Sequence, residues 1–508
     1  MKPILLQTFL LSFLCVVACA GALRAEKPNV IVILCDDLGY GDVKALNPNG
    51  KIPTPNIDRL ASQGVSFTDA HSSSSVCTPT RYSLLTGRYN WRTRLKSGVL
   101  GGISPPLIEP ETKTIADLFK QQGYATACVG KWHLGLGWQK KEADASFKDG
   151  VEQGPEGWSV DYDKAFTKGP LDVGFDYYFG ISASLDMVPY TFLENDRVQV
   201  VPTIDNAFPM MLGRNPQTVS RKGPAAEGFD ANQVLPSLTK KSVELIDGWA
   251  ADAHKGKPFF LYLPLASPHT PIVPTEPWQG KSGINPYADF VMQTDAAVGQ
   301  ILEALDHHRL ADDTLIVFTS DNGCSPQADF EELAKFDHNP SYVFRGHKAD
   351  IFEGGHRVPY IARWPKGLPP NSRCDALVGL QDTLATCADV LDVDLPEDVG
   401  VDSFSWLPRV TKGSASPNIP VRQSLVHHSI NGSFAIRRGK WKLCRCSDSG
   451  GWSLPRPSAK SKSLPPVQLF DLESDIGERK NLASEHPEIV KSLSDELDQL
   501  SNAGRSRS

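Results

Sequence analysis

NVIVILCDD, residues 29–37, is an unbroken apolar run that ends in two adjacent aspartates, Asp36 and Asp37. A strand that is apolar at successive positions, rather than at alternate ones, is typical of a sheet covered on both faces. Polar residues directly after such a strand lie at its carboxyl end, where open α/β sheets bind their ligands. The stretch therefore predicts a buried strand that brings two carboxylates to a binding crevice.

Three later apolar runs end in polar residues in the same way. They are ATACVG (125–130) before Lys131 and His133, PFFLYLPLA (258–266) before His269, and TLIVFTS (314–320) before Asp321 and Asn322. Helix-like segments separate the runs, for example 112–123 and 287–308. This alternation predicts an α/β fold in which helices sandwich a mixed, mostly parallel sheet. We expect the strand ends to form one crevice.

Each polar group has an ordinary structural explanation when it is considered alone. Asp36-Asp37 is compatible with a solvated turn, and residues 321–323 (DNG) are a common turn sequence. Their joint occurrence at successive strand ends favours a shared site instead. Its oxygen ligands suit a hard cation, and a crowded site made of protein groups favours Ca²⁺, with Mg²⁺ as the alternative. A cation beside lysine and histidine side chains predicts an anion pocket.

The chain has 508 residues, enough for one large α/β domain and a smaller one. Residues 136–170 and 195–237 are rich in Gly, Pro, Asn and Asp, and we interpret them as functional insertions at the rim of the site. Residues 411–420 resemble a linker. The expected division is a catalytic α/β domain at 26–415, a C-terminal α+β subdomain with an antiparallel sheet and a helix at 416–500, and a disordered tail at 501–508.

Residues 1–25 have the features of a secretory signal peptide. Lys2 precedes an apolar run, small residues follow it, and cleavage is expected between residues 20 and 25. The run is too short for a transmembrane span, and no later segment is apolar enough for one. We therefore expect export to the periplasm or the extracellular space. VVAC (16–19) also resembles a lipoprotein box, so that a lipid anchor at Cys19 is the alternative.

Charge and cysteine content exclude some classes of function. The net charge of −7, without a clustered basic stripe, argues against nucleic acid as a partner. The cysteines that follow the leader show neither a CxxC pair nor a zinc pattern. Disulfide pairing does not follow from the sequence, and a homo-oligomer stays an open alternative.

SSSSVCTPTRYSLLTG (72–87) places Cys77 where a helix begins. Thr78 is a candidate cap, Pro79 suits the first helical position, and Gly87 can end the helix in a left-handed conformation. A lone cysteine is more often a buried apolar residue than a reactive one. Its position at the positive end of a helix dipole nevertheless predicts contact with an anion.

The five residues from Cys77 to Arg81 (CTPTR) match the C-x-P-x-R core of the type I sulfatases, and SLLTGR (83–88) continues that signature. Further blocks of this family extend over most of the mature chain, namely NVIVILCDDLGYGD, GKWHLG, SPHTP, SDNG, FEGGHRVPYIARWP and LFDLESDIGERKNLA. The sequence most resembles the branch of arylsulfatase A and N-acetylgalactosamine-6-sulfatase. The resemblance implies an alkaline phosphatase-like fold and hydrolysis of sulfate monoesters, either aryl or carbohydrate sulfates and above all sulfated glycans.

The resemblance also implies a modified cysteine. In this family a maturation enzyme oxidises the cysteine that corresponds to Cys77 to Cα-formylglycine (3-oxoalanine). The hydrated aldehyde is the nucleophile and forms a covalent sulfo-enzyme intermediate. A serine or thiol would leave a stable ester, whereas the second hydroxyl of the hydrate allows elimination of sulfate and restores the aldehyde.

By the same resemblance, one group of residues binds the cation and the nucleophile. Arg81 is expected to hold the oxyanion of the hydrate. The expected Ca²⁺ ligands are Asp36, Asp37, Asp321, Asn322 and the modified residue 77.

A second group is expected to bind sulfate and move protons. Lys131 and His133 would contact formylglycine and sulfate, with His133 as the base for elimination. His269 would bind sulfate and protonate the leaving oxygen, Lys348 would be the second sulfate-binding lysine, and Ser184 would lie near the sulfate. The acid–base roles of His133, His269 and Lys348 stay interchangeable, because sequence does not fix protonation.

Two other functions stay open as alternatives. One is a phosphomonoester or phosphonate hydrolase of the same superfamily, although a two-metal phosphatase would offer further His/Asp clusters. The other is an exported protein that binds sulfated glycans without turnover and keeps Cys77 as a thiol. The natural ester, the sulfate position and endo or exo action do not follow from the sequence.

Overall fold

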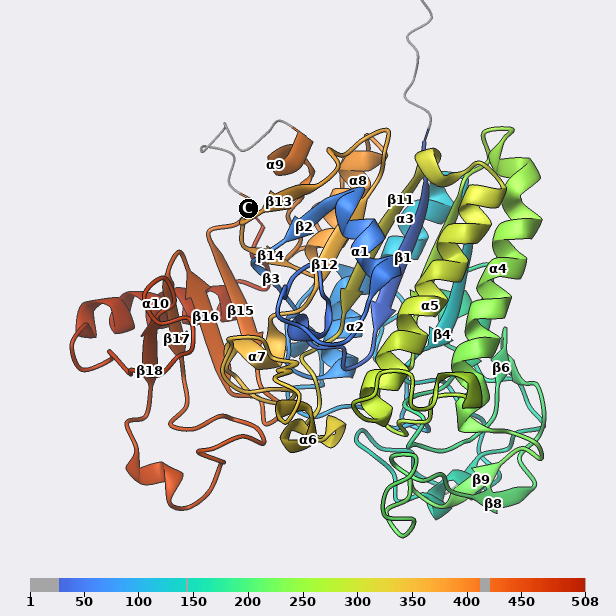
Figure 1. Ribbon diagram of the computed structural model, residues 1–508, viewed down its shortest axis with the longest axis horizontal. Coiled ribbons are helices and arrows are strands. Elements are labelled where there is room, and N and C mark those ends of the chain that lie inside the picture. Colours follow the sequence, from blue (N-terminus) through green and yellow to red (C-terminus); the bar gives the residue numbers. More distant parts are fainter. Residues whose placement is uncertain (1–26, 143–144, 412–420, 508) are drawn as a thin grey trace, which may run out of the picture.

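The computed structural model in Figure 1 describes residues 27–142, 145–411 and 421–507. Its centre is a ten-stranded sheet in the order β13-β2-β12-β11-β1-β10-β4-β5-β6-β7. Five neighbouring strands in this order are parallel: β11 (Thr314–Ser320), β1 (Asn29–Cys35), β10 (Phe259–Pro264), β4 (Ala125–Lys131) and β5 (Tyr177–Ile181). The mixed, mostly parallel sheet predicted from the sequence is confirmed.

Shorter strands extend this parallel centre on both sides. On one side β12 and β2 continue the sheet with antiparallel pairings and β13 then pairs parallel with β2, while β6 and β7 add antiparallel pairs on the other. Their bounds are β12 (Tyr360–Arg363), β2 (Val65–Phe67), β13 (Ser372–Cys374), β6 (Leu193–Glu194) and β7 (Arg197–Val198).

Successive side chains of β1 enter different hydrophobic cores. Ile31 and Ile33 pack on one face of the sheet, whereas Val30 and Val32 pack on the other. This alternation is the physical reason for the unbroken apolar run, because each face of the strand needs its own apolar side chains. Both cores are covered by helices, as Figure 1 shows for α4 and α5.

The helices divide between the two faces. The first face is covered by α1 (Pro55–Ser62), α4 (Val234–Ala253) and α5 (Pro286–His307). The second face is covered by α2 (Cys77–Thr86), α3 (Ile115–Gln121), α8 (Asp382–Val390) and α9 (Leu407–Thr411). Shorter elements lie outside these layers: β3 (Ala70–His71), β14 (Val378–Gly379), β8 (Ile204–Asn206), β9 (Gly223–Ala225), α6 (Phe330–Ala334) and α7 (Glu353–His356).

A second, four-stranded antiparallel sheet lies near the C-terminus, coloured red and orange in Figure 1. It contains β15 (Ser424–His428), β16 (Phe434–Arg438), β17 (Trp441–Cys444) and β18 (Gln468–Asp471), and α10 (Pro487–Asn502) packs on it. Its edge strand contacts the segment that precedes α2. The Ser75 N–H donates to the His428 carbonyl at 3.1 Å, and the His428 N–H donates to the Ser73 carbonyl at 3.2 Å. The C-terminal sheet is thus hydrogen-bonded to the chain that leads into Cys77.

Some sequence predictions differ from the structure, and others lie outside the described residues. The predictions that Thr78 caps this helix and that Pro79 occupies its first position are wrong, because α2 begins at Cys77, with Val76 as its N-cap. The tail prediction is also wrong for residues 501–507: α10 continues to Asn502, and the N–H groups of Ser506 and Arg507 donate to one carbonyl, that of Val401. The predicted signal peptide and the linker from residue 412 onward lie outside the described residues.

No helix in the described part of the chain is long and apolar enough to cross a membrane. The eight described cysteines are all unpaired.

Candidate active site

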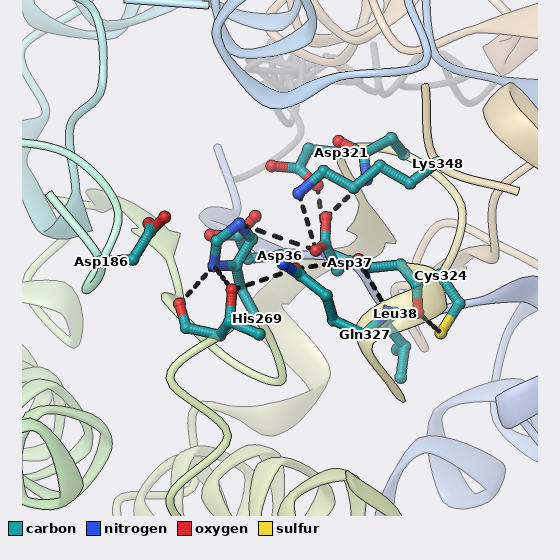
Figure 2. A network of polar contacts seen from close by, with 12 residues as sticks. Asp36, Asp37, Leu38, Asp186, His269, Asp321, Cys324, Gln327 and Lys348 are labelled. Atoms are coloured by element: carbon teal, nitrogen blue, oxygen red, sulfur yellow. Dashed lines mark hydrogen bonds and ion pairs between the residues drawn. The ribbon is translucent and has the colours of Figure 1, made fainter. Parts of the chain in front are cut away.

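The predicted site residues meet at the carboxyl ends of the five parallel strands. Because these strands are neighbours in the sheet, their ends form one edge, and the residues that follow them share one crevice. Figure 2 shows part of this group. Asp36 and Asp37 follow β1, Lys131 and His133 lie at the end of β4, Ser184 follows β5, His269 follows β10, and Asp321 and Asn322 follow β11.

Cys77 enters this crevice as the first residue of α2 and is almost completely buried. Its Sγ lies within 4.8 Å of carboxylate oxygens of Asp36 and Asp321. Burial raises the pKa of the Cys77 thiol to about 11, against the lowering effect of Lys131 and Lys348. The unmodified side chain is therefore a neutral thiol at the N-terminus of a helix, where the backbone N–H groups favour anions.

Arg81 shares the face of α2 with Cys77, since residues four apart in a helix lie one above the other. Its Nη2 lies 2.8 Å and its Nε 3.1 Å from Asp321 Oδ2, and its Nη1 donates to the Lys131 carbonyl at 3.0 Å. Gly87 ends the helix with φ 63, as the sequence predicts. The spacing of Cys77 and Arg81 thus places a fixed guanidinium beside the thiol.

Two buried lysines pair with the aspartates that follow β1. Lys131 Nζ lies 2.5 Å from Asp36 Oδ2, and Lys348 Nζ lies 2.8 Å from Asp37 Oδ2, as Figure 2 shows for the second pair. Asn322 Nδ2 donates to Asp37 Oδ1 at 2.7 Å. Such buried charges persist in proteins only when they are paired or ligate an ion.

The carboxylates of this cluster repel one another. Burial raises the pKa of Asp36, but the charges of Lys131 and His269 outweigh burial and hold it well below its usual range. Burial and the negative charge of Asp36 raise the pKa of Asp321 to about 7. A cation between these groups would relieve that repulsion.

Two buried oxygens in the cluster fit such a cation. Asp36 Oδ1 and Asn322 Oδ1 have no hydrogen-bond partner among the described residues. Carboxylate and amide oxygens are ligands for a hard cation such as Ca²⁺. The donor set therefore fits the cation that the sequence predicts, together with the oxygens of Asp37 and Asp321.

The tautomers of the two site histidines follow from backbone contacts. His133 Nε2 donates to the Leu100 carbonyl at 2.7 Å, while its Nδ1 has no partner among the described residues. Burial and the charges of Lys131 and Arg81 lower the pKa of His133 well below its ordinary value, so the ring is neutral. His269 Nδ1 donates to the Thr270 carbonyl at 2.5 Å, which leaves Nε2 facing the site. His133 therefore presents a free lone pair at Nδ1, whereas His269 directs Nε2 toward Asp37 Oδ2, 3.7 Å away.

Local strain also marks this crevice. Asp37 and His133 have φ values of 63 and 57, in the left-handed region that few side chains adopt. Such conformations persist where the surrounding structure enforces them, and they concentrate at functional sites. Both residues lie directly beyond strand ends, where the chain turns its side chains into the crevice.

The structure thus brings together ten of the predicted residues: Asp36, Asp37, Cys77, Arg81, Lys131, His133, His269, Asp321, Asn322 and Lys348. Ser184 lies just beyond β5, and its side chain makes no hydrogen bond to them. Ser184 Oγ is buried and has no partner among the described residues, and its segment is fixed where the His133 N–H donates to the Ser182 carbonyl at 2.9 Å. Sequence reasoning missed the carbonyls of Leu100 and Thr270, which orient the two histidines. Every residue type has a backbone carbonyl, so no sequence pattern could have predicted these two contacts.

A cavity of about 610 Å³ adjoins the crevice on the side of His269. Thr270 and Gln327 line it and also contact each other, with the Thr270 hydroxyl donating to Gln327 Oε1 at 3.3 Å. Its other walls include Met211 and Arg214 from the second long insertion and Phe330 from α6. The volume of this cavity is large enough for a sugar-sized ligand. Its lining of an aromatic side chain, apolar methionines and a few polar groups is typical of small-molecule sites.

Comparisons with known proteins agree with this geometry. A family model described as Sulfatase matches residues 28–393. The N-acetylgalactosamine-6-O-sulfatase of Bacteroides thetaiotaomicron is 34% identical over 94% of this chain and 94% of that protein. Human arylsulfatase A is 32% identical over 93% of this chain and 88% of that protein.

Solved structures show the same similarity in three dimensions. A structure described as part of the glycosaminoglycan metabolism of Bacteroides thetaiotaomicron has a TM-score of 0.78 and 32% identity, over 94% of this chain and 100% of that one. A phosphonate monoester hydrolase of Silicibacter pomeroyi has a TM-score of 0.59 over 93% of this chain and 94% of that one, and its 19% identity shows a shared fold alone.

Proposed function

Because the chain belongs to the sulfatase family and is a sulfuric ester hydrolase, we propose that it removes sulfate from carbohydrate sulfates through a Cα-formylglycine made from Cys77. One observation carries this proposal. Cys77 is the first residue of α2, and its side chain faces the carboxylates of Asp36 and Asp321 inside a ring of buried cationic groups. Neither a structural cysteine nor a thiolate nucleophile explains that position.

The modified residue would supply the covalent chemistry. A hydrated aldehyde offers one hydroxyl for attack on sulfur and a second hydroxyl whose deprotonation releases the sulfate. The N-terminus of α2 and the Arg81 guanidinium favour negative charge at position 77. The chain's own contribution is therefore a fixed electrostatic environment around that residue.

Asp36, Asp37, Asp321 and Asn322 would hold a cation, with position 77 as a further ligand. The oxygen-only donor set favours Ca²⁺ over Mg²⁺, since Ca²⁺ accepts more protein ligands in a less regular geometry. The ion would supply Lewis acidity toward the substrate oxygens. The free Asp36 Oδ1 and Asn322 Oδ1 support this assignment.

Lys131 and Lys348 would bind the sulfate, and the histidines would move protons. His133 is neutral and has a free Nδ1, which makes it a suitable base near position 77. His269 Nε2 faces Asp37 Oδ2 at 3.7 Å and lies beside the cavity, where it can protonate the leaving oxygen. Ser184 Oγ is free to donate to a sulfate oxygen.

The leaving group is proposed to be a sugar that occupies the cavity beside His269. Its volume of about 610 Å³ and the Phe330 ring suit a carbohydrate, which stacks its apolar face on aromatic side chains. One relative bears the name N-acetylgalactosamine-6-O-sulfatase, and a structural relative was solved in complex with k-i-k-neocarrahexaose. Both support a glycan as the substrate.

Maturation and location belong to the same proposal. A formylglycine-generating enzyme would act on the CTPTR segment before folding, because Cys77 is buried in the folded chain. The signal-peptide features of residues 1–25 support export, with lipidation of Cys19 as the alternative.

Mass spectrometry of the tryptic peptide that carries residue 77, after coexpression with the maturation enzyme, tests the modification. The expected result is the mass of formylglycine in place of cysteine. Sulfate release is then measured on regioselectively sulfated sugars, with phosphate and phosphonate esters in the same panel. Cys387→Ala is the matched control, since Cys387 is an equally buried cysteine that lies on α8, in the core on the second face of the sheet. Fully active protein with an intact Cys77 thiol would refute the proposal.

A further inference from the structure

Three histidines form a buried cluster that the catalytic crevice does not use. His71 lies on β3, His356 on α7 and His427 on β15, and all three are 0% exposed. One ring nitrogen of each lies within 4.8 Å of a nitrogen of the other two. The cluster joins the C-terminal sheet to the segment that precedes Cys77, since His71 and His427 lie on opposite sides of that junction.

The outer nitrogen of each ring faces an oxygen. His71 Nε2 lies 2.8 Å from Asp69 Oδ1, His356 Nε2 lies 3.1 Å from the Ile351 carbonyl, and His427 Nδ1 lies 3.2 Å from the Ser72 carbonyl. A metal-bound histidine almost always donates its other N–H to a carboxylate or a backbone carbonyl in this way. These contacts favour tautomers that leave the inner nitrogens without protons.

The inner nitrogens then need a cation. His71 Nδ1 and His356 Nδ1 lie 3.0 Å apart, so their lone pairs face each other when both protons are on the outer nitrogens. His427 Nε2 is buried and has no hydrogen-bond partner among the described residues. A metal ion would satisfy three nitrogens at once.

The charged groups around the cluster come from several elements. Lys442 Nζ on β17 lies 3.0 Å from His356 Nε2, and its charge is balanced by Glu353 at 3.0 Å and Glu478 at 2.8 Å. Arg357 and Arg437 lie 3.2 and 3.4 Å from the Asp69 carboxylate.

These contacts define a competing arrangement. Lys442 could donate to His356 Nε2, and His356 Nδ1 could then donate to His71 Nδ1. That chain of hydrogen bonds still leaves His427 Nε2 without a partner, which favours the metal ion.

We propose that His71, His356 and His427 bind a divalent transition-metal ion of the zinc type, separate from the catalytic cation. Imidazole nitrogen suits Zn²⁺, whereas the oxygen ligands of the crevice suit Ca²⁺. The His356 and His427 rings are stacked, with centroids 3.9 Å apart, so coordination turns one of them. The ion is structural, because its ligands are fully buried and come from three segments that meet only when the chain folds. It fixes the C-terminal sheet against the chain that leads into Cys77.

Metal analysis of the full-length protein in excess Ca²⁺ tests the site. Protein refolded with Zn²⁺ and then dialysed is expected to retain one equivalent of zinc by inductively coupled plasma mass spectrometry. His427→Gln is expected to retain at least tenfold less. His428→Gln is the matched control, because His428 is equally buried on the same strand but pairs with Asn90 and Ser429. Equal zinc in wild type and His427→Gln would overturn the proposal.

Cobalt spectroscopy keeps the test decisive if the variants fail to fold. Wild-type protein loaded with Co²⁺ in excess Ca²⁺ is expected to show the visible absorption of Co²⁺ bound by histidine nitrogens at low coordination number, and added Zn²⁺ should abolish it. Wild-type protein that shows neither this absorption nor bound zinc contains the hydrogen-bond chain from Lys442 instead, and the proposed metal site is then wrong.

Discussion

Lys131 Nζ lies 2.5 Å from Asp36 Oδ2, and neither side chain is exposed. The second oxygen, Asp36 Oδ1, has no hydrogen-bond partner among the described residues. One carboxylate therefore contacts a fixed ammonium group through one oxygen and offers the other to a cation. In this way Asp36 connects Lys131, the proposed sulfate-binding lysine, to the proposed cation site.

Removal of the cation is expected to abolish activity and lower stability. Ca²⁺ that binds only the folded state adds about 3 kcal/mol to the free energy of unfolding at 100 times its Kd. We expect a chelator to lower the Tm, and Ca²⁺ to restore both Tm and sulfate release more fully than Mg²⁺. The Asn322→Leu variant keeps a side chain of similar volume but loses the amide oxygen. Calorimetry should show that its Kd for Ca²⁺ is higher by about tenfold or more, as is typical when a contact of a metal site is lost. A Tm that does not change when Ca²⁺ is removed and added back would contradict the proposed cation site.

Substitution of Cys77 should separate the two halves of the reaction. Cys77→Ala is expected to end sulfate release while the Tm changes little, because one small side chain contributes little to so large a core. Cys77→Ser keeps an oxygen nucleophile but lacks the second hydroxyl, so it should be sulfated at most once per molecule. Intact-protein mass spectrometry after incubation with substrate detects that adduct. Sustained turnover by Cys77→Ser would rule out the elimination step.

The cavity beside His269 should determine how tightly the sugar part of the substrate binds, without affecting the rate of sulfate ester cleavage. Phe330→Ala is expected to raise KM for a sulfated glycan about tenfold, as the loss of one aromatic contact of ~1.4 kcal/mol would give. The kcat/KM for a small aryl sulfate should stay the same, because that substrate does not reach Phe330. Phe336→Ala is the control, since this ring is 42% exposed and does not line the cavity. If Phe330→Ala changed kcat/KM equally for the glycan and the aryl sulfate, the sugar would not bind in this cavity.

The central strands could be predicted from sequence because burial on both faces constrains every position. The ends of β1 and β11 agree with the predicted 29–35 and 314–320. The short flanking strands β12 and β13 carry no such pattern, since an edge or antiparallel strand of three or four residues has too few positions to show a period. Their pairing depends on contacts far along the chain.

The candidate site could be predicted in its residue types but not in its supporting contacts. Strand ends locate Asp36 and Asp321, because the topology of a parallel sheet puts them on one edge. The contact between Ser75 and His428 could not be predicted, because it joins segments more than 350 residues apart, and the acceptor of both hydrogen bonds is a backbone carbonyl. The same holds for the tail at 501–507. Its polar composition predicts disorder, but two of its backbone N–H groups donate to the Val401 carbonyl about 100 residues earlier in the chain.

Glu152 should make the free energy of unfolding depend on pH, and a single substitution can separate its contribution from that of the other titratable groups. Its Oε2 accepts from the Gly102 N–H at 3.0 Å and its Oε1 from the Val188 N–H at 3.1 Å, so it holds the first long insertion against the rim of the site. Burial raises the pKa of Glu152 to about 7, despite these hydrogen bonds. The folded state thus binds the proton more tightly than the unfolded chain does, and the resulting stability is complete below about pH 4.3 and disappears as the pH rises through 7.

The full shift corresponds to about 4 kcal/mol, at ~1.4 kcal/mol for each pKa unit, and about 3 kcal/mol of it falls between pH 4.5 and 8. Glu152→Gln stays neutral at every pH, so wild type should lose about 3 kcal/mol of unfolding free energy relative to this variant between pH 4.5 and 8. Urea unfolding at a series of pH values measures that difference. Glu156→Gln, at an exposed position three residues from Gln153, is the control and should track wild type. A difference between wild type and Glu152→Gln that stays constant over this range would show that Glu152 is ionised throughout in the folded protein.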